Sequence, residues 1–338
     1  MNLIISMELL SLIAIMNTIH KHTQPLRIAF FGTPEFSASI LRTLIDHNFI
    51  PALIITKPDT LVGRKKILTS SPVKRIALEN TLPLLQPEKL DDSFFEIFAT
   101  YSIDLALTVA YGKIFPQKLL TLPPYGCLNV HASLLPLYRG ASPIQSALLD
   151  GKKQTGITLM QMEKGLDSGP IIARQAISIT DDETAFSLTP NLAKLGGEIL
   201  LSFLSSWDRK AIKSKPQEHN LASFCTCIHK QDGKIDWNQP AQKIYNTYRA
   251  FSPWPGVFSS FQNKKKSLRI RLLEIKISQE YDLKLQAGTL LYTKKCMKVQ
   301  SGDGQFLSVQ KLQVEGKKPT TPEEFFRGYP EAHNSLLH

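Results

Sequence analysis

Short apolar runs separated by polar segments and turn residues mark the first two thirds of the chain. Runs of this kind occupy residues 26–31, 51–57, 104–110 and the segment that opens at Cys127. Continuous apolar runs of four to eight residues are typical of strands that are buried on both faces, as in parallel sheets. The first run ends at Gly32 and leads into a helical pattern, as in an α/β unit. We therefore predict an α/β domain with a Rossmann-like, parallel-rich sheet.

The later part of this domain follows from local signals. Ser142 and Pro143 suit the N-cap and first position of a helix. Residues 155–162 and 170–179 look like an antiparallel strand pair, and the loop that joins them carries Asp167. A helix over residues 198–207 is expected to close the domain, which we place at 26–210. The polar, aperiodic segment that follows is interpreted as a linker over 211–228.

Residues 229–338 have a different pattern. Residues 267–277 alternate partly between basic and apolar positions, and further short apolar runs follow between turn signals such as 301–304. Several short strands in about a hundred residues favour a small β-barrel. A capping box, Thr321 to Glu324, precedes Phe325 and predicts a short terminal helix. The chain thus reads as two globular domains, with 43% hydrophobic and 20% charged residues.

Three polar side chains carry the candidate chemistry. Asn129 and His131 are two apart on a predicted strand, so they share one face of it. Asp167 lies in a loop bounded by glycines. An amide donor, an imidazole and a carboxylate can stabilise an oxyanion and move a proton, which suits acyl transfer without a metal or a covalent nucleophile. Taken singly, each also fits a structural role: a turn asparagine, a partnered histidine and a turn aspartate.

The residues around these three resemble a known family. The run N-x-H-x-S-L-L-P-x-Y-R-G, followed by L-D-x-G, is similar to the signature of the folate-dependent formyltransferases. Residues 232–258 resemble the start of the second domain of the family members that formylate methionyl-tRNA. The resemblance spans residues 26 to about 329. It implies a Rossmann-like domain followed by an OB-type barrel, with Asn129, His131 and Asp167 as catalytic residues.

The resemblance also implies the two substrates. The formyl donor is 10-formyltetrahydrofolate, used as a co-substrate without a metal, and the acceptor is the amine of methionine on initiator tRNA. The turn Ser133, Leu134, Leu135 and Pro136 corresponds to the folate-contacting turn of the family. Backbone at Tyr111 and Gly112 is expected to line the same cleft. Relatives often have an acidic residue where this chain has Pro170, which affects the loop and leaves Asp167 in place.

Charge separates the two halves of the chain. The formal charge is +11, and residues 211–338 hold 20 Lys and Arg against 11 Asp and Glu, while the first 210 residues are nearly balanced. A basic domain beside a neutral one suits a polyanionic partner. On charge alone, a well-solvated basic surface is an equal alternative, and the family resemblance favours tRNA.

Two basic clusters are candidates for tRNA contacts. The segment 57–75 has no strand or helix period at its centre and holds Arg64, Lys65 and Lys66. The resemblance implies that it is the insertion loop that contacts the acceptor stem, with Arg64 as the best single candidate; the alternative is a solvated connection. Lys264 and Lys265, with Arg269 and Arg271 on the next strand, would add a basic barrel face for the RNA backbone.

Other features narrow the function classes. The G-x-G-x-x-G fingerprint is missing after Gly32, so no dinucleotide site is predicted. Four cysteines without a paired framework fit a reducing cytoplasm. The spacing of Cys225 and Cys227 from nearby histidines matches no usual zinc site.

The first 25 residues open with an apolar run, residues 1–17, which lacks the basic n-region of a secretory signal. We expect them to be an N-terminal extension outside the fold, most simply explained by an upstream start codon; a weak membrane-associating helix is the alternative. We expect a cytoplasmic monomer with no membrane partner. Two rival functions remain: a formyltransferase for a sugar amine or glycinamide ribonucleotide, and a non-catalytic tRNA-binding protein.

Overall fold

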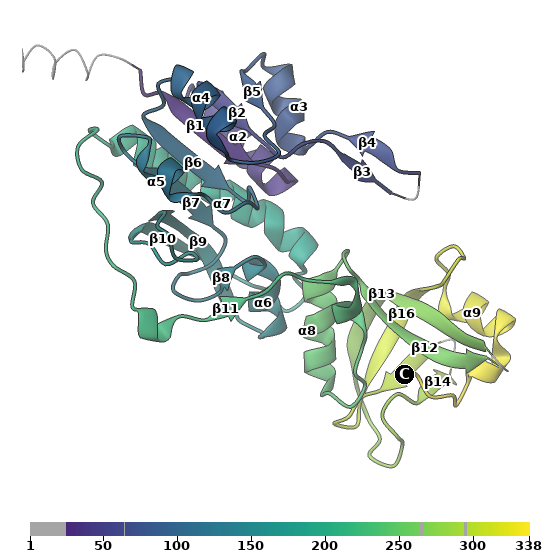
Figure 1. The fold of residues 1–338 in the computed structure, drawn as a ribbon. Coiled ribbons are helices and arrows are strands. Elements are labelled where there is room, and N and C mark those ends of the chain that lie inside the picture. Colours follow the sequence, from purple (N-terminus) through teal and green to yellow (C-terminus); the bar gives the residue numbers. More distant parts are fainter. Residues whose placement is uncertain (1–24, 64, 264–265, 294–295) are drawn as a thin grey trace, which may run out of the picture. The chain divides into compact units, whose positions relative to one another are not determined.

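The computed structural model describes residues 25–63, 65–263, 266–293 and 296–338 (Figure 1). Its larger sheet has seven strands in the order β10 (Ile171–Ser178), β9 (Gln154–Gln161), β7 (Cys127–His131), β6 (Leu105–Val109), β1 (Ile28–Gly32), β2 (Leu53–Ile55) and β5 (Leu84–Leu85). The strands from β7 to β5 pair in parallel, and β9 pairs with β7 in the antiparallel sense. The predicted α/β domain with a parallel-rich sheet is confirmed.

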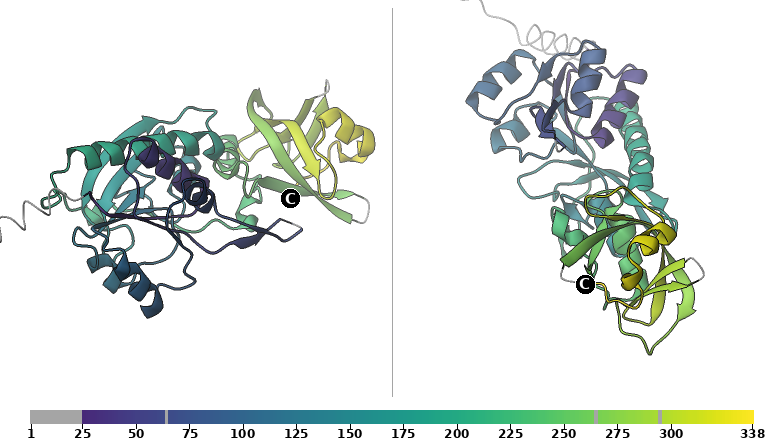
Figure 2. Two further views of the ribbon diagram at one scale, coloured as in Figure 1. Left: turned by 90° about the horizontal axis from the view of Figure 1, so that it is seen from above. Right: turned by 90° about the vertical axis from the view of Figure 1, so that its right-hand side faces the viewer.

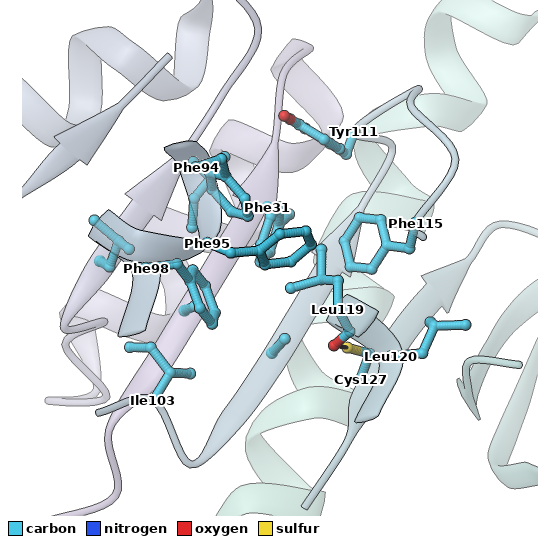
Figure 3. Close-up of a cluster of buried hydrophobic side chains, with 14 residues drawn as sticks. Phe31, Phe94, Phe95, Phe98, Ile103, Tyr111, Phe115, Leu119, Leu120 and Cys127 are labelled. Carbon is cyan, nitrogen blue, oxygen red and sulfur yellow. Dashed lines mark hydrogen bonds between the residues drawn. The ribbon is translucent and has the colours of Figure 1, made fainter. Parts of the chain in front are cut away.

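Helices cover both faces of the parallel strands, as the continuous apolar runs require. On one face, α4 (Asp92–Thr100) and α5 (Gln117–Thr121) pack an aromatic cluster around Phe31 (Figure 3). On the other, α7 (Ala185–Ser206) approaches α2 (Glu35–Asp46) closely at Gly196. A Cβ added there would lie 2.9 Å from Ile40 and 3.1 Å from Val130 of β7. Glycine therefore allows the helix to reach the sheet.

The basic segment contains regular structure that was not predicted. Strands β3 (Thr60–Val62) and β4 (Ile67–Thr69) pair as an antiparallel hairpin, which projects from the body of its unit (Figure 2). The expectation of a connection without strand period was wrong, because all six strand residues are exposed and leave no buried face to produce alternation. After the hairpin, the Ser71 side chain caps α3 (Pro72–Glu79) by accepting a hydrogen bond from the Lys74 amide.

Contacts divide the chain into two compact units. The first holds the described residues up to His131 together with Thr158–Arg174 and Ala193–Gln217. The second holds Ala132–Ile157, Gln175–Leu192 and Glu218–His338. The division into domains at 26–210 and 229–338, with a linker over 211–228, stays a prediction.

The second unit contains the antiparallel sheet of the C-terminal half. Its strands lie in the order β12 (Val257–Asn263), β13 (Lys266–Tyr281), β16 (Gln305–Val314), β15 (Cys296–Gln300) and β14 (Leu290–Thr293). This all-antiparallel arrangement fits the predicted OB-type domain. The capping box at Thr321 is present and begins α9 (Pro322–Gly328). Helix α8 (Ala241–Phe251) precedes the sheet, and short 3-10 turns lie at His219–Leu221, Lys230–Gly233 and Pro330–Ala332.

Helix α6 (Pro143–Leu149) belongs to the second unit and begins after Ser142, with Pro143 in its first turn as predicted. The Ser142 side chain does not cap this helix, because its hydroxyl donates a hydrogen bond to the Thr226 carbonyl instead. Next to it, β8 (Arg139–Gly140) pairs in parallel with β11 (Phe224–Cys225). In the described part of the chain, no helix has the length and apolar character needed to cross a membrane.

Candidate active site

Strand β7 places two of the predicted catalytic residues. Asn129 pairs with Thr108 of β6 and with Met160 of β9, and His131 ends the strand opposite Thr158. Alternation along the strand turns Asn129 and His131 to the same face as Cys127, whereas Val130 faces α7. The carboxyl ends of parallel strands are where open α/β sheets bind ligands. The geometry therefore puts an amide and an imidazole at the edge of the sheet where ligands bind in such folds.

Asp167 lies in the turn between β9 and β10. Its φ of 45° is in the left-handed region, which costs energy for most residues and is tolerated best by aspartate and asparagine after glycine. The turn closes tightly at Gly169, where a Cβ would lie 2.1 Å from the Gln161 carbonyl oxygen. Only glycine fits at this position, so the loop has little freedom.

The structure brings the three predicted side chains together. Asn129 Nδ2 donates a hydrogen bond to Asp167 Oδ1 over 3.3 Å. Asp167 Oδ2 lies 3.6 Å from His131 Nδ1, an ion-pair distance. The exposed fraction is 6% for the His131 side chain and 15% for that of Asp167. One carboxylate thus faces both partners, with a different oxygen for each. A primary amide has a second N–H, which can donate to a ligand.

Cys127 is on the same strand face, but it is a poor nucleophile. Burial raises the pKa of its thiol to about 12, and the thiol donates to the Leu119 carbonyl. A thiol with such a pKa stays protonated at neutral pH and does not attack carbonyls. The strand therefore offers donors, without a covalent catalyst at this position.

The two predicted folate residues after β6, Tyr111 and Gly112, differ in their exposure. The Tyr111 ring packs against Phe31 and Phe115 in the core, with 1% exposure, and burial raises the pKa of its hydroxyl to about 12 (Figure 3). Its side chain is therefore a packing element, and the expectation that its backbone lines the folate cleft stays a prediction. Gly112 is exposed with a φ of 72°, and Lys57 Nζ lies 2.5 Å from where its Cβ would be.

The predicted folate turn belongs to the second unit, and it is held by a hydrogen bond inside the turn and by burial of its side chains. Ser133 is fully buried, and its hydroxyl donates to the Leu137 carbonyl over 2.6 Å. Leu135 is also fully buried, whereas Leu134 and Pro136 keep part of their surface exposed. Of the four residues, Leu134 and Pro136 offer side-chain surface to a ligand.

The predicted tRNA contacts are described only in part. Lys65 and Lys66 are exposed at the turn between β3 and β4, while Arg64, Lys264 and Lys265 lie outside the described residues. The two arginines expected to extend a basic barrel face contact their own domain. The Arg269 guanidinium lies 3.4 Å from the centre of the Phe258 ring, and Arg271 points at the Pro253 and Pro255 carbonyls at 3.5 Å.

Sequence reasoning missed one residue next to the trio. Gln217, in the segment interpreted as a linker, is buried and donates hydrogen bonds to the carbonyl oxygens of Asp167 and Gly169. A glutamine among exposed polar residues gives no signal of its own. An open cleft of about 440 Å³ lies at the end of β5 and the start of α4, and none of the predicted site residues lines it.

No group of three or more His, Cys, Asp or Glu side chains suited to a metal ion occurs among the described residues. Cys225 is half-buried and Cys227 is exposed, and neither forms a disulfide with another described residue. The polar groups described at the site are the Asn129 amide and the His131 imidazole, which can donate hydrogen bonds, and the Asp167 carboxylate, which accepts them.

Comparison with known proteins places the chain. Residues 26–204 match the formyl transferase family, and residues 227–330 match the formyl transferase C-terminal domain. The chain belongs to the formyl transferase family. It is an enzyme that transfers formyl groups, and the fold of both parts agrees with that assignment.

Curated relatives match over nearly the whole chain. Methionyl-tRNA formyltransferase from Caldicellulosiruptor saccharolyticus is 40% identical over 316 residues, covering 92% of this chain and 99% of the relative. The enzymes of the same name from Thermodesulfovibrio yellowstonii and Staphylococcus aureus are 38% and 37% identical, covering 89% and 92% of this chain and 95% and 98% of their own.

Solved structures support the fold. A sugar 3N-formyl transferase, WlaRD, crystallised with dTDP and 5-N-formyl-THF, aligns with a TM-score of 0.61 at 18% identity, covering 87% of this chain and all of that one. HypX from Aquifex aeolicus in complex with tetrahydrofolic acid aligns with a TM-score of 0.60 at 15% identity, covering 92% of this chain and 48% of that one. At such identities the likeness concerns the fold alone.

Proposed function

We propose that the enzyme transfers the formyl group of 10-formyltetrahydrofolate to the α-amine of methionine on initiator tRNA, for translation initiation. The observation that carries this proposal is the match, over both domains, to relatives named methionyl-tRNA formyltransferase. The sugar 3N-formyl transferase WlaRD aligns over 87% of this chain at 18% identity, so it supports the fold and does not favour a small-amine acceptor. The close approach of Asn129, His131 and Asp167 argues against a non-catalytic RNA-binding protein.

The reaction needs an oxyanion site and a proton acceptor. The neutral amine attacks the formyl carbon, and the carbonyl oxygen becomes an oxyanion in a tetrahedral intermediate. The Asn129 amide and the His131 imidazole are the proposed donors to that oxygen, and loss of one such donor typically costs about 3–4 kcal/mol of barrier. The intermediate then collapses by breaking the bond between the formyl carbon and the folate nitrogen. That nitrogen leaves with one proton, which balances the proton that the attacking amine gives up.

Asp167 is the proposed proton acceptor. Its carboxylate lies beside both donors, so an amine bound at the formyl carbon is within reach of it directly or through one water. Its contacts with Asn129 and His131 also orient those side chains before substrate binds. This preorganisation is the larger part of what such a site supplies.

The remaining contacts are proposed from the same family. Ser133 to Pro136, with backbone at Tyr111 and Gly112, hold the folate. Lys65 and Lys66 at the hairpin turn contact the acceptor stem together with Arg64, which lies outside the described residues, and Lys264 and Lys265 contact the RNA backbone. Exposed lysines at the end of a projecting hairpin suit phosphate contacts that position the RNA without reading its sequence. We propose that the enzyme works as a monomer in the cytoplasm.

A side-by-side acceptor assay tests this function. The purified full-length chain is incubated with 10-formyltetrahydrofolate and, in separate reactions, with charged initiator tRNA, charged elongator methionine tRNA, a sugar amine and glycinamide ribonucleotide. Rapid formylation of initiator methionyl-tRNA alone is expected. Formylation of a small amine with no activity on either tRNA would refute the proposed acceptor.

A further inference from the structure

The segment before Gln217 is fastened to the strands that flank the Asp167 loop. Lys215 exchanges two backbone hydrogen bonds of 2.8 Å with Ile171, the first residue of β10. The Ser214 hydroxyl donates to the side-chain oxygen of Gln161, the last residue of β9, over 2.9 Å. Residues 214–217, which we call the strap, therefore attach to the chain on both sides of the loop.

Gln217 is the part of the strap that enters the loop. It is 6% exposed, while its neighbours Pro216 and Glu218 are exposed. Its side-chain nitrogen donates to the Asp167 carbonyl over 2.9 Å and to the Gly169 carbonyl over 2.7 Å. A glutamine amide has two N–H donors, and here both are directed at backbone oxygens of one turn.

These two hydrogen bonds fix the backbone from which the Asp167 carboxylate projects. With a φ of 45°, Asp167 is held in a conformation that a free loop would leave. Fixing its carbonyl and that of Gly169 sets the peptide planes on the C-terminal side of Asp167. The direction of the side chain towards Asn129 and His131 depends on those planes.

We propose that Gln217 is a positioning residue, which holds the Asp167 loop so that the carboxylate meets Asn129 and His131. The inference rests on the proposed function, because it assigns Gln217 a part in the same reaction. The side chain of Gln217 does not itself touch the reacting atoms. Its effect is on the alignment of Asp167, and a misplacement of about 1 Å in such a group costs on the order of a hundredfold in rate.

The test compares Gln217→Met with Glu218→Gln in the full-length enzyme. Methionine keeps the length of the Gln217 side chain and removes both donors, whereas Glu218→Gln changes an exposed neighbour that has no proposed role. Gln217→Met is expected to lower kcat by about 10- to 100-fold, with KM for both substrates within about twofold of native. Glu218→Gln is expected to keep native kcat. Thermal unfolding of each protein shows that folded enzymes are compared.

A double variant separates positioning from a merely structural role. If Gln217 acts only through the Asp167 carboxylate, Gln217→Met should cost nothing further in an Asp167→Asn background, because the group it aligns is already gone. Full additivity of the two losses would overturn the proposal, as would a Gln217→Met enzyme with kcat within about twofold of native. If Gln217→Met does not fold, Gln217→Asn, one methylene too short to reach both carbonyls, takes its place. If the native enzyme does not formylate methionyl-tRNA, that result refutes the proposed function and not the role of Gln217.

Discussion

At the scale of single residues, Asp167 is the position where conformation and chemistry are most closely linked. Its backbone is left-handed, and its two carboxylate oxygens face different partners. Asparagine tolerates the same backbone conformation, so Asp167→Asn removes the charge without adding strain. We expect kcat to fall about 100-fold or more, because the proposed proton acceptor is lost, with folate affinity within about threefold of native. Steady-state kinetics and folate titration measure both quantities.

The neighbouring Ser168 provides the control for that change. Ser168→Ala alters the same loop at a residue without a proposed role, and it should keep kcat within about twofold of native. If Asp167→Asn retains native turnover, the carboxylate is not the proton acceptor, and its contacts with Asn129 and His131 are only structural.

The sequence predicted part of this site for a clear reason. Strand alternation placed Asn129 and His131 on one face, and this needed only local information. The approach of Asp167 to these two residues depends on the antiparallel pairing of β7 with β9. The hydrogen bonds from Gln217 to the Asp167 loop depend on a backbone bridge between Lys215 and Ile171. Neither pairing leaves a periodic signal in the sequence, so Gln217 was read as part of a linker.

At the scale of elements, the Asp59 carboxylate anchors the β3–β4 hairpin at its base. Asp59 accepts hydrogen bonds from Lys74 and Gln86, each over 2.8 Å, and from Ser70 over 3.3 Å. These bonds, the one from Lys74 first, lower the pKa of Asp59 below its ordinary value of 3.8. Because the pKa of Asp59 is lowered in the folded protein, its hydrogen bonds stabilise the folded protein at neutral pH. This stabilisation is lost as the pH falls through the lowered pKa.

Replacing this anchor tests whether the hairpin positions tRNA. Asp59→Asn removes the charge that holds Lys74 and should loosen the hairpin relative to its unit. We expect KM for charged initiator tRNA to rise about three- to tenfold, because ordering the hairpin is then an added cost of binding, while KM for folate stays unchanged. Steady-state kinetics with each substrate varied in turn measures the effect.

A matched ion pair elsewhere in the same unit serves as the reference. Lys118 and Asp92 are 2.9 Å apart, and the Asp92 side chain is 89% exposed. Asp92→Asn should leave both KM values at native levels, because exposed pairs contribute little. An equal rise in the tRNA KM for Asp59→Asn and Asp92→Asn would mean that net charge matters and the anchor does not.

At the scale of the whole molecule, the excess of positive charge resides in the C-terminal part of the sequence. Residues 211–338 carry 20 Lys and Arg against 11 Asp and Glu. In the described part of the barrel, Arg269 and Arg271 are engaged with Phe258 and with backbone carbonyls, so their charges are held close to their own domain. We therefore expect the proposed attraction for tRNA to come from the sum of many surface charges more than from a single contact.

This distribution predicts a different salt dependence for the two substrates. Each phosphate that a lysine or arginine neutralises releases counterions, so tRNA binding weakens steeply as salt rises. Between about 50 and 200 mM salt, we expect KM for charged initiator tRNA to rise at least about tenfold, and KM for the folate donor to change by less than about twofold. Folate has few charges and releases few ions when it binds. Kinetics of the native chain across this range checks the prediction, and equal salt slopes for both substrates would contradict a tRNA site built on the basic residues.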